Sequence, residues 1–222
     1  GCEGPAATVQ EITTGVVGPG TKVEVNGVVA MSHKFLVSKS SNTNSCLWGV
    51  FVSAPGLAET AANTGIIALS YGNKATQPMG QQEFYCPRLG QDEIGDAIPD
   101  NIKPGDTLDL VGVVDRFPDP PNCTGDNPPN KIGMLQLNQV CKAEITGTAT
   151  PPTPKVMTAT EIAQISSTDA ADNAFHDMWG GVKVRIENAA VEPEAGMVVG
   201  EFGIIHLQNG VEVGDKIYYR GY

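Results

Sequence analysis

Long apolar runs and basic residues are both scarce in this chain. No apolar run approaches the roughly 20 residues that a helix needs to span a bilayer, so the sequence predicts no membrane-spanning helix. Lys and Arg number 14 against 25 Asp and Glu, which gives a formal net charge of −11. Because nucleic-acid binding depends mainly on cations that neutralise phosphates, this balance argues against a nonspecific nucleic-acid surface and favours an acidic, solvated one.

Motifs for catalysis and for zinc binding are also missing. There is no G-x-S-x-G sequence, no cysteine–histidine context for a nucleophile and no carboxylate spacing that marks an acid–base couple. No C-x-x-C pair and no histidine at ligand spacing accompany the cysteines. The histidines are only three, and His206 lies in an alternating segment that suggests a structural role. We therefore expect a protein that is not an enzyme and that binds no cofactor.

A calcium site is the one metal site that the sequence leaves open. Asp115, Asp119 and Asp126 flank the proline-rich stretch "PDPPNCTGDNPPN". Hard cations such as calcium take carboxylate and carbonyl oxygens as ligands. The D-x-D-x-D-G pattern is absent, however, so a solvated turn is the favoured interpretation of these three residues.

The chain has five cysteines, of which four lie between residues 46 and 141 while Cys2 stands alone. Two disulfides and one cysteine with a separate role fit an oxidising compartment. Four cysteines allow three connectivities. We prefer Cys46–Cys86 with Cys123–Cys141, because these pairs close the shorter loops.

The first two thirds of the sequence read as five β-strands. A hydrophobic fraction of 41% excludes wholesale disorder, and 26 Gly with 16 Pro favour short strands and turns. "TKVEVNGVVAMS" alternates, with Val23, Val25, Gly27 and Val29 on one side. The five predicted strands are residues 21–32, 46–55, 64–72, 105–117 and 131–145.

Five strands with a long connection between the third and the fourth have the chain order of an OB fold, a small Greek-key barrel. Gly27 and Gly112 suit the bends that such a barrel needs. The sequence therefore predicts an N-terminal tether at residues 1–20 and an OB-like barrel at residues 21–145.

A Thr/Pro-rich linker at residues 146–155 predicts a domain boundary. After it, Thr158-x-x-Glu161 forms a capping box that predicts a short helix, and alternating segments follow. "KPGDTLDLVGVVDRF" and "EVGDKIYYRGY" share a Gly-Asp step, which predicts a second OB-like barrel at residues 156–222. This barrel lacks its last strand, so we expect the natural chain to continue past Tyr222. The predicted fold class is mainly β: tandem OB-like five-stranded Greek-key barrels, the second incomplete, with one short helix at its start.

Two short stretches resemble known families. "GCEGPAAT" resembles the start of a mature bacterial lipoprotein, which implies that Cys2 is lipidated and is the only membrane attachment; a free Cys2 thiol is the alternative. "GTKVEVNGVV" with "KPGDTLDLVGVVDRF", and "TEIAQ…HDMWGGVKVRIENAAV", resemble OB-fold accessory modules of secreted bacterial nucleases and surface esterases. In those families catalysis lies in a separate phosphodiesterase domain, and nothing like it occurs in this sequence. The resemblance implies an extracytoplasmic location, at the bacterial cell surface, outer membrane or periplasm.

Together these features predict an exported, non-catalytic interaction or assembly module. Its partner would be a protein, another component of the cell envelope or a second copy, contacted through residues 73–104 and 117–130. The alternative function is an accessory segment of a secreted nuclease that binds single-stranded nucleic acid. In that case Trp48, Phe51 and Tyr71 would stack on bases, and Lys34, Lys39 or Lys74 would contact phosphates; core packing explains Trp48 and Phe51 equally well.

Overall fold

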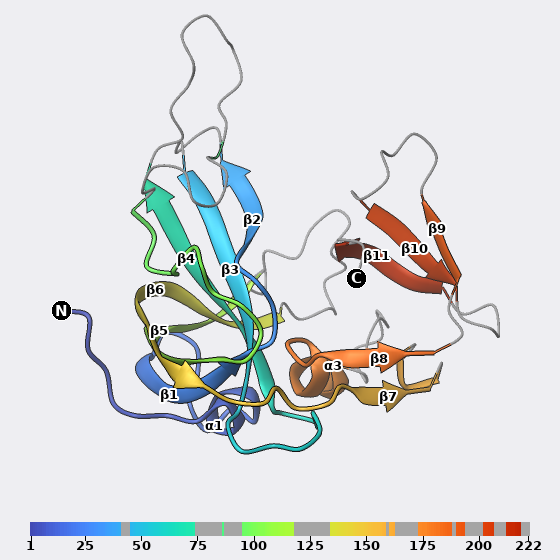
Figure 1. The fold of residues 1–222 in the computed structure, drawn as a ribbon, viewed down its shortest axis with the longest axis horizontal. Coiled ribbons are helices and arrows are strands. Elements are labelled where there is room, and N and C mark those ends of the chain that lie inside the picture. Colours follow the sequence, from blue (N-terminus) through green and yellow to red (C-terminus); the bar gives the residue numbers. More distant parts are fainter. Residues whose placement is uncertain are drawn as a thin grey trace, which may run out of the picture.

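The computed structural model describes residues 1–40, 45–73, 86, 95–117, 134–158, 160–162, 173–187, 190–193, 202–206 and 212–218. The protein is mainly β, as predicted (Figure 1). Its helices and strands are α1 (Val9–Thr13), β1 (Lys22–Ala30), β2 (Phe35–Ser40), β3 (Ser45–Ser53), β4 (Gly65–Asn73), β5 (Asp106–Phe117), β6 (Met134–Thr148), β7 (Lys155–Met157), α3 (Asn173–Trp179), β8 (Val184–Ile186), β9 (Ala190–Pro193), β10 (Phe202–His206) and β11 (Glu212–Tyr218). None of the described helices is long and apolar enough to cross a membrane.

The first six strands form one sheet in the order β1-β5-β6-β4-β3-β2. Because β1 also pairs with β3, hydrogen bonds close a ring through β1, β5, β6, β4 and β3. The pairing of β4 with β6 is parallel, and every other pairing in this sheet is antiparallel. All five strands predicted before residue 146 are present. The sequence did not predict β2, which is held only at the side of the ring, by pairing with β3.

Two glycines bend the ring where the sequence predicts bends. At Gly27 the backbone adopts φ +66°, its N–H donates to Asp109 Oδ1 at 2.9 Å, and the register with β5 shifts. A second shift surrounds Gly112, where a Cβ atom would lie 2.8 Å from the Leu137 side chain. The sequence predicts that Val29 lies on the same side of the strand as Val23 and Val25. Because of the register shift at Gly27, it is Val28 that joins Val23 and Val25 in the main core.

The N-terminal segment is part of the fold, in place of the tether predicted for residues 1–20. Thr8 and Glu11 form a capping box that starts α1, and both Val9 and Ile12 are fully buried in the main core. Residue Ala6 also bridges to Glu24 of β1. The sequence signal is faint because a five-residue helix offers only one apolar pair at helical spacing.

The predicted linker at residues 146–155 contacts the first part of the chain. Strand β6 runs on to Thr148, and Thr153 forms a bridge with Glu59. The Thr60 hydroxyl then donates to the Lys183 carbonyl at 2.7 Å and accepts from the Lys155 N–H at 2.9 Å. These contacts place the start of β7 and the residue before β8 against the connection between β3 and β4.

The same contact continues at the end of α3. Asn63, in the turn between β3 and β4, donates its N–H to the Met178 carbonyl at 2.8 Å. Gly65 and Gly181 approach so closely that a Cβ atom on Gly65 would lie 2.3 Å from the Gly181 carbonyl oxygen. Met157, Ile162 and Trp179 form a second apolar cluster over this region, with Ala62 packed against it.

The chain after residue 153 differs from the predicted second barrel. The capping box of Thr158 and Glu161 is confirmed by reciprocal hydrogen bonds. The strands then form a parallel pair, β7 with β8, and an antiparallel sheet in the order β11-β10-β9. No pairing among the described residues joins these two sheets into a ring, and Gly214 and Asp215 lie within β11 rather than at its start.

Candidate functional site

The three aromatic residues predicted to stack on bases do not form one exposed surface. Trp48 is buried in a small cluster with Cys46, Leu36 and Cys86. Phe51 is partly buried and stacks on Phe35 of β2, with ring centroids 5.5 Å apart. Tyr71 is the exception, with half of its surface exposed on β4. Of the three, only Tyr71 is exposed.

Of the three lysines predicted to contact phosphates, only Lys34 has a side chain that the structure describes. Lys34 is 1% exposed, and its ammonium group forms ion pairs with Asp96 and Asp100. A buried lysine whose charge is neutralised by two carboxylates is not available to bind a phosphate group. Lys39 lies at the end of β2, where the structure does not describe side chains, and Lys74 is outside the described residues.

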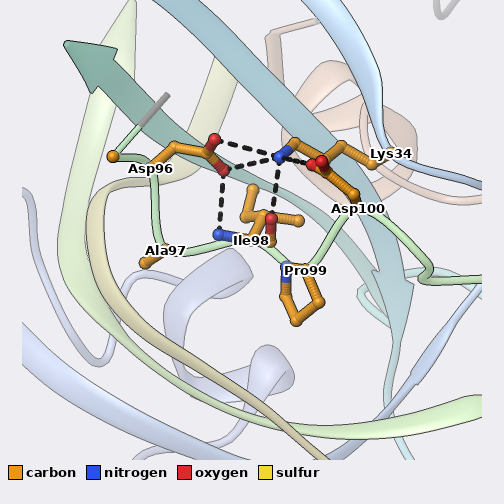
Figure 2. A pocket seen from close by; sticks show the side chains of 7 residues that line it. Lys34, Asp96, Ala97, Ile98, Pro99 and Asp100 are labelled. Atoms are coloured by element: carbon orange, nitrogen blue, oxygen red, sulfur yellow. Dashed lines mark hydrogen bonds and ion pairs between the residues drawn. The ribbon is translucent and has the colours of Figure 1, made fainter. Parts of the chain in front are cut away.

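Lys34 is instead the centre of a compact polar cluster (Figure 2). Its Nζ atom lies 2.9 Å from Asp96 Oδ1 and 3.0 Å from Asp96 Oδ2, and it donates to the Ile98 carbonyl at 2.8 Å. Asp96 is also buried, whereas one third of the Asp100 side chain is exposed. These residues line a cavity of about 330 Å³ together with Gly95, Ala97 and Pro99.

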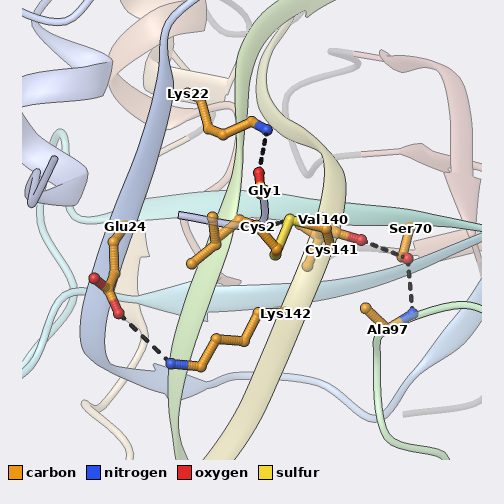
Figure 3. The surroundings of a disulfide bond; sticks show 10 residues. Gly1, Cys2, Lys22, Glu24, Ser70, Ala97, Val140, Cys141 and Lys142 are labelled. Carbon is orange, nitrogen blue, oxygen red and sulfur yellow. Dashed lines mark hydrogen bonds and ion pairs between the residues drawn. A yellow bond between two sulfur atoms is a disulfide. The ribbon is translucent and has the colours of Figure 1, made fainter. Parts of the chain in front are cut away.

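The segment that carries both aspartates is fixed by core packing and by hydrogen bonds. Ile98 and Ile102 are buried in the main core. The Ala97 N–H donates to the Ser70 hydroxyl at 2.9 Å, and that hydroxyl donates to the Val140 carbonyl at 2.8 Å (Figure 3). Asp96 Oδ1 also accepts the Ile98 N–H at 3.0 Å. The positions of both carboxylates are therefore set by the strands beneath them.

Sequence reasoning missed this cluster. Lys34 is separated from Asp96 by 62 residues, so no local spacing links them. The sequence suggests Lys34 only as a phosphate contact, because lysine side chains are mostly exposed. The one available signal is the placement of Asp96 and Asp100 around the apolar Ile98, directly before a strand.

The structure contains two disulfides, Cys2–Cys141 and Cys46–Cys86. The second is the predicted pair. Cys141 bonds to Cys2 rather than to Cys123, which lies outside the described residues. A sulfur atom in a disulfide cannot also carry a lipid, so this pairing corrects the expected lipidation of Cys2. Two disulfides are typical of proteins in oxidising, extracytoplasmic compartments.

The path of the N-terminal segment brings Cys2 to β6 (Figure 3). The Gly1 carbonyl accepts a hydrogen bond from Lys22 Nζ at 3.0 Å, and a Cβ atom on Gly4 would lie 2.9 Å from the Val23 backbone. The segment therefore lies close against β1. Because Lys142 of β6 forms an ion pair with Glu24 of β1 nearby, Cys141 is within reach of Cys2.

Asp115, proposed from the sequence as a calcium ligand, is engaged by amide groups. Its Oδ2 atom accepts hydrogen bonds from Asn138 Nδ2 at 2.8 Å and Gln136 Nε2 at 3.4 Å. Asp119 and Asp126 are outside the described residues. Within the part of the chain that is described, no group of three histidine, cysteine or acidic side chains is placed to hold a metal ion.

The two segments predicted as contact surfaces are described only in part. Of residues 73–104, the structure describes Asn73, Cys86 and residues 95–104; of residues 117–130, it describes only Phe117, which is exposed at the end of β5. Comparison with known proteins adds no assignment: no family model, curated protein or solved structure matches this chain.

Proposed function

We propose that this chain is an exported, non-catalytic interaction module, and that its five-stranded ring is OB-like. The order of the ring supports this proposal. Three successive antiparallel strands, β1, β3 and β4, are followed by β5 and β6, with β6 returning parallel to β4. An OB fold binds its ligands on its second and third strands and on the loops beside them. In this chain those strands are β3 and β4.

The observation that carries the function is the chemistry of that face. Tyr71 is half exposed on β4, while Lys34, the one predicted phosphate contact whose side chain is described, is buried and forms ion pairs with two carboxylates. Tyrosine is enriched at protein–protein interfaces. Single-strand binding, by contrast, needs a positively charged groove beside its aromatic rings. Among the side chains that the structure describes, the exposed Tyr71 and the buried, ion-paired Lys34 favour a polypeptide partner.

A photo-cross-linking residue at position 71 tests this proposal. The matched control carries the same residue at Val16, which is 74% exposed but lies after α1 rather than on β4. In envelope fractions of cells that produce the protein, we expect a cross-linked adduct of defined mass from position 71 and none from position 16. Mass spectrometry identifies the adduct as a second copy or another polypeptide. Adducts from both positions, or from neither, contradict the proposal.

The alternative, an accessory segment that binds single-stranded nucleic acid, is tested by fluorescence titration with labelled oligonucleotides. An interaction module of the proposed kind shows no saturation at micromolar concentrations. Binding that weakens steeply with added salt, as phosphate contacts require, and that is lost in Tyr71→Ala, would establish the alternative instead.

A further inference from the structure

The cluster around Lys34 holds a nucleophile in contact with an electrophile and with an acid–base group. We propose that Lys34 and Asp96 join through an amide bond between Lys34 Nζ and Asp96 Cγ, formed by the folded chain itself. This is one modification of the protein's own side chains, and it is independent of the interaction proposed above.

The nucleophile and the electrophile are already in contact. Lys34 Nζ lies at nearly equal distances, 2.9 and 3.0 Å, from the two oxygens of Asp96. The carboxyl carbon between those oxygens therefore lies within reach of the Lys34 amine. Both side chains are almost fully buried. Two reacting groups that the fold holds in contact have a very high effective concentration, which lowers the barrier to their reaction.

A hydrogen-bond donor stands where negative charge develops. The Ile98 N–H donates to Asp96 Oδ1 at 3.0 Å. When an amine adds to the carboxyl carbon, Oδ1 takes the charge of the tetrahedral intermediate, and a fixed backbone donor stabilises that charge. Because the N–H belongs to the same tight segment as Asp96, it is in place before the reaction begins.

Asp100 supplies the acid–base group. Its Oδ1 atom is hydrogen-bonded to Lys34 Nζ, and one third of its side chain reaches solvent. A carboxylate in contact with the ammonium group can take a proton from it and return the proton to the leaving oxygen. Figure 2 shows Asp96 and Asp100 on two sides of the Lys34 ammonium group.

The step balances without any further reactant. The Lys34 ammonium group transfers one proton to Asp100, and the neutral amine forms an N–C bond to Asp96 Cγ. The bond from Cγ to Oδ2 then breaks, and Oδ2 leaves as water with two protons, one returned by Asp100 and one from the attacking nitrogen. Asp100 ends as the carboxylate it was at the start, and the product is a neutral amide.

Burial favours that product. An ammonium group and a carboxylate removed from water each carry a desolvation cost that their attraction only partly offsets. An amide has no net charge, so its formation removes that cost. The Trp48 ring, whose centre is 5.0 Å from Lys34 Nζ, shields one side of the cluster. The cavity of about 330 Å³ that these residues line gives the departing water a place to go.

The bond would also join segments that are distant in sequence. Lys34 precedes β2, and Asp96 precedes β5. The Cys46–Cys86 disulfide already ties the connection between β4 and β5 to β3. An amide at Lys34 would fasten the far end of the same connection without depending on redox conditions.

Intact-mass measurement of the full chain, reduced and denatured, tests the proposal directly. We expect a mass lower by one water than the sequence requires. After digestion with trypsin, which needs a free lysine, we expect no cleavage at Lys34 and a branched peptide that joins the sequences around residues 34 and 96. A folded protein with the full sequence mass and a cleavable Lys34 would overturn the proposal.

Variants distinguish amide formation from an ion pair between the same side chains. Lys34→Arg keeps the charge but cannot form the amide, so it retains the full mass. Asp100→Asn keeps a polar side chain and slows formation by about 100-fold, followed by mass after cell-free synthesis. The partly exposed pair of Lys142 and Glu24, 3.7 Å apart, is the internal control and remains unlinked in the same digest. Mapping of the Cys46–Cys86 disulfide verifies that each variant is folded; a folded Asp100→Asn protein that links at the wild-type rate would contradict the role of Asp100.

Discussion

Arg116 and Asp177 are joined by two parallel hydrogen bonds, Nη1 to Oδ1 at 2.7 Å and Nη2 to Oδ2 at 2.9 Å. The pair connects the end of β5 to α3, across the boundary where the sequence predicts separate domains. Both side chains are partly buried. Paired N–H donors on one carboxylate are among the stronger polar contacts in proteins, so this one holds the α3 segment to the sheet.

A double-mutant cycle with Arg116→Ala and Asp177→Ala measures that contact. We expect a coupling free energy of about 1–3 kcal/mol from urea unfolding, since the two residues are in direct contact. The exposed pair of Arg185 and Glu187, 3.3 Å apart, is the control, with an expected coupling of about 0.2–1 kcal/mol. Additive effects of the two Arg116–Asp177 substitutions, within about 0.5 kcal/mol, would show that α3 is not held there.

Gly181→Ala tests the close approach between the end of α3 and β4. A Cβ atom at Gly181 would lie 2.5 Å from the Ile66 Cα atom, so the two backbones would have to move apart. We expect a loss of about 1–3 kcal/mol in the free energy of unfolding. Gly18→Ala, where a Cβ atom meets nothing within 4 Å, is the matched control. Equal stability of the two variants would place the α3 segment away from the sheet.

The Cys2–Cys141 disulfide closes a loop of 139 residues in the chain. Replacing both cysteines by serine should lower the free energy of unfolding by about 2–4 kcal/mol, measured by chemical denaturation. Peptide mapping without reduction should recover Cys2 linked to Cys141. Recovery of Cys2 with an acyl chain, or linked to Cys123, would contradict this pairing.

The capping box at Thr158 makes a small part of the stability depend on pH. The backbone N–H of Thr158, and then its hydroxyl, donate to the Glu161 carboxylate and lower the pKa of Glu161 below its ordinary value of 4.5, with a smaller contribution from Lys155. A carboxyl whose pKa is lowered by folding stabilises the fold above its unfolded pKa. That contribution is lost as the pH falls through the lowered, folded value.

An NMR titration of the Thr158 amide should therefore show a midpoint below the ordinary glutamate range. Glu161→Gln should abolish this titration and leave the acid unfolding curve less steep. The exposed Glu3→Gln variant serves as the control and should leave the titration unchanged. A midpoint at or above 4.5 would mean that the capping box does not form in solution.

Several elements of the fold could be predicted because their signal is local. The alternation of "TKVEVNGVV" and of "GDTLDLVGVVDRF" identified β1 and β5, and the glycines inside them marked the register shifts at Gly27 and Gly112. The capping box at Thr158 was equally readable, since its two partners are three residues apart. The contact of Thr153 with Glu59 and Thr60 could not be predicted, because a Thr/Pro-rich stretch has the composition of a linker whether or not it makes such contacts.

Which residues on a predicted strand are exposed could not be predicted from the sequence. Trp48 and Tyr71 both lie on predicted strands, yet one is buried and the other is half exposed. Alternation along a strand gives the two faces but not what covers each of them. Trp48 is covered by Leu36 and Cys86, which come from other parts of the chain.

Local residue patterns are enough to predict a β-rich protein with the five strands of its ring, the bends at Gly27 and Gly112 and the Cys46–Cys86 disulfide, because strand alternation, glycine positions and loop length are properties of short segments. Only the tertiary structure decided that Lys34 is paired with Asp96 and that Cys141 is bonded to Cys2, across 62 and 139 residues. Those contacts depend on how the ring of strands closes, and closure is a property of the whole chain rather than of any segment of it.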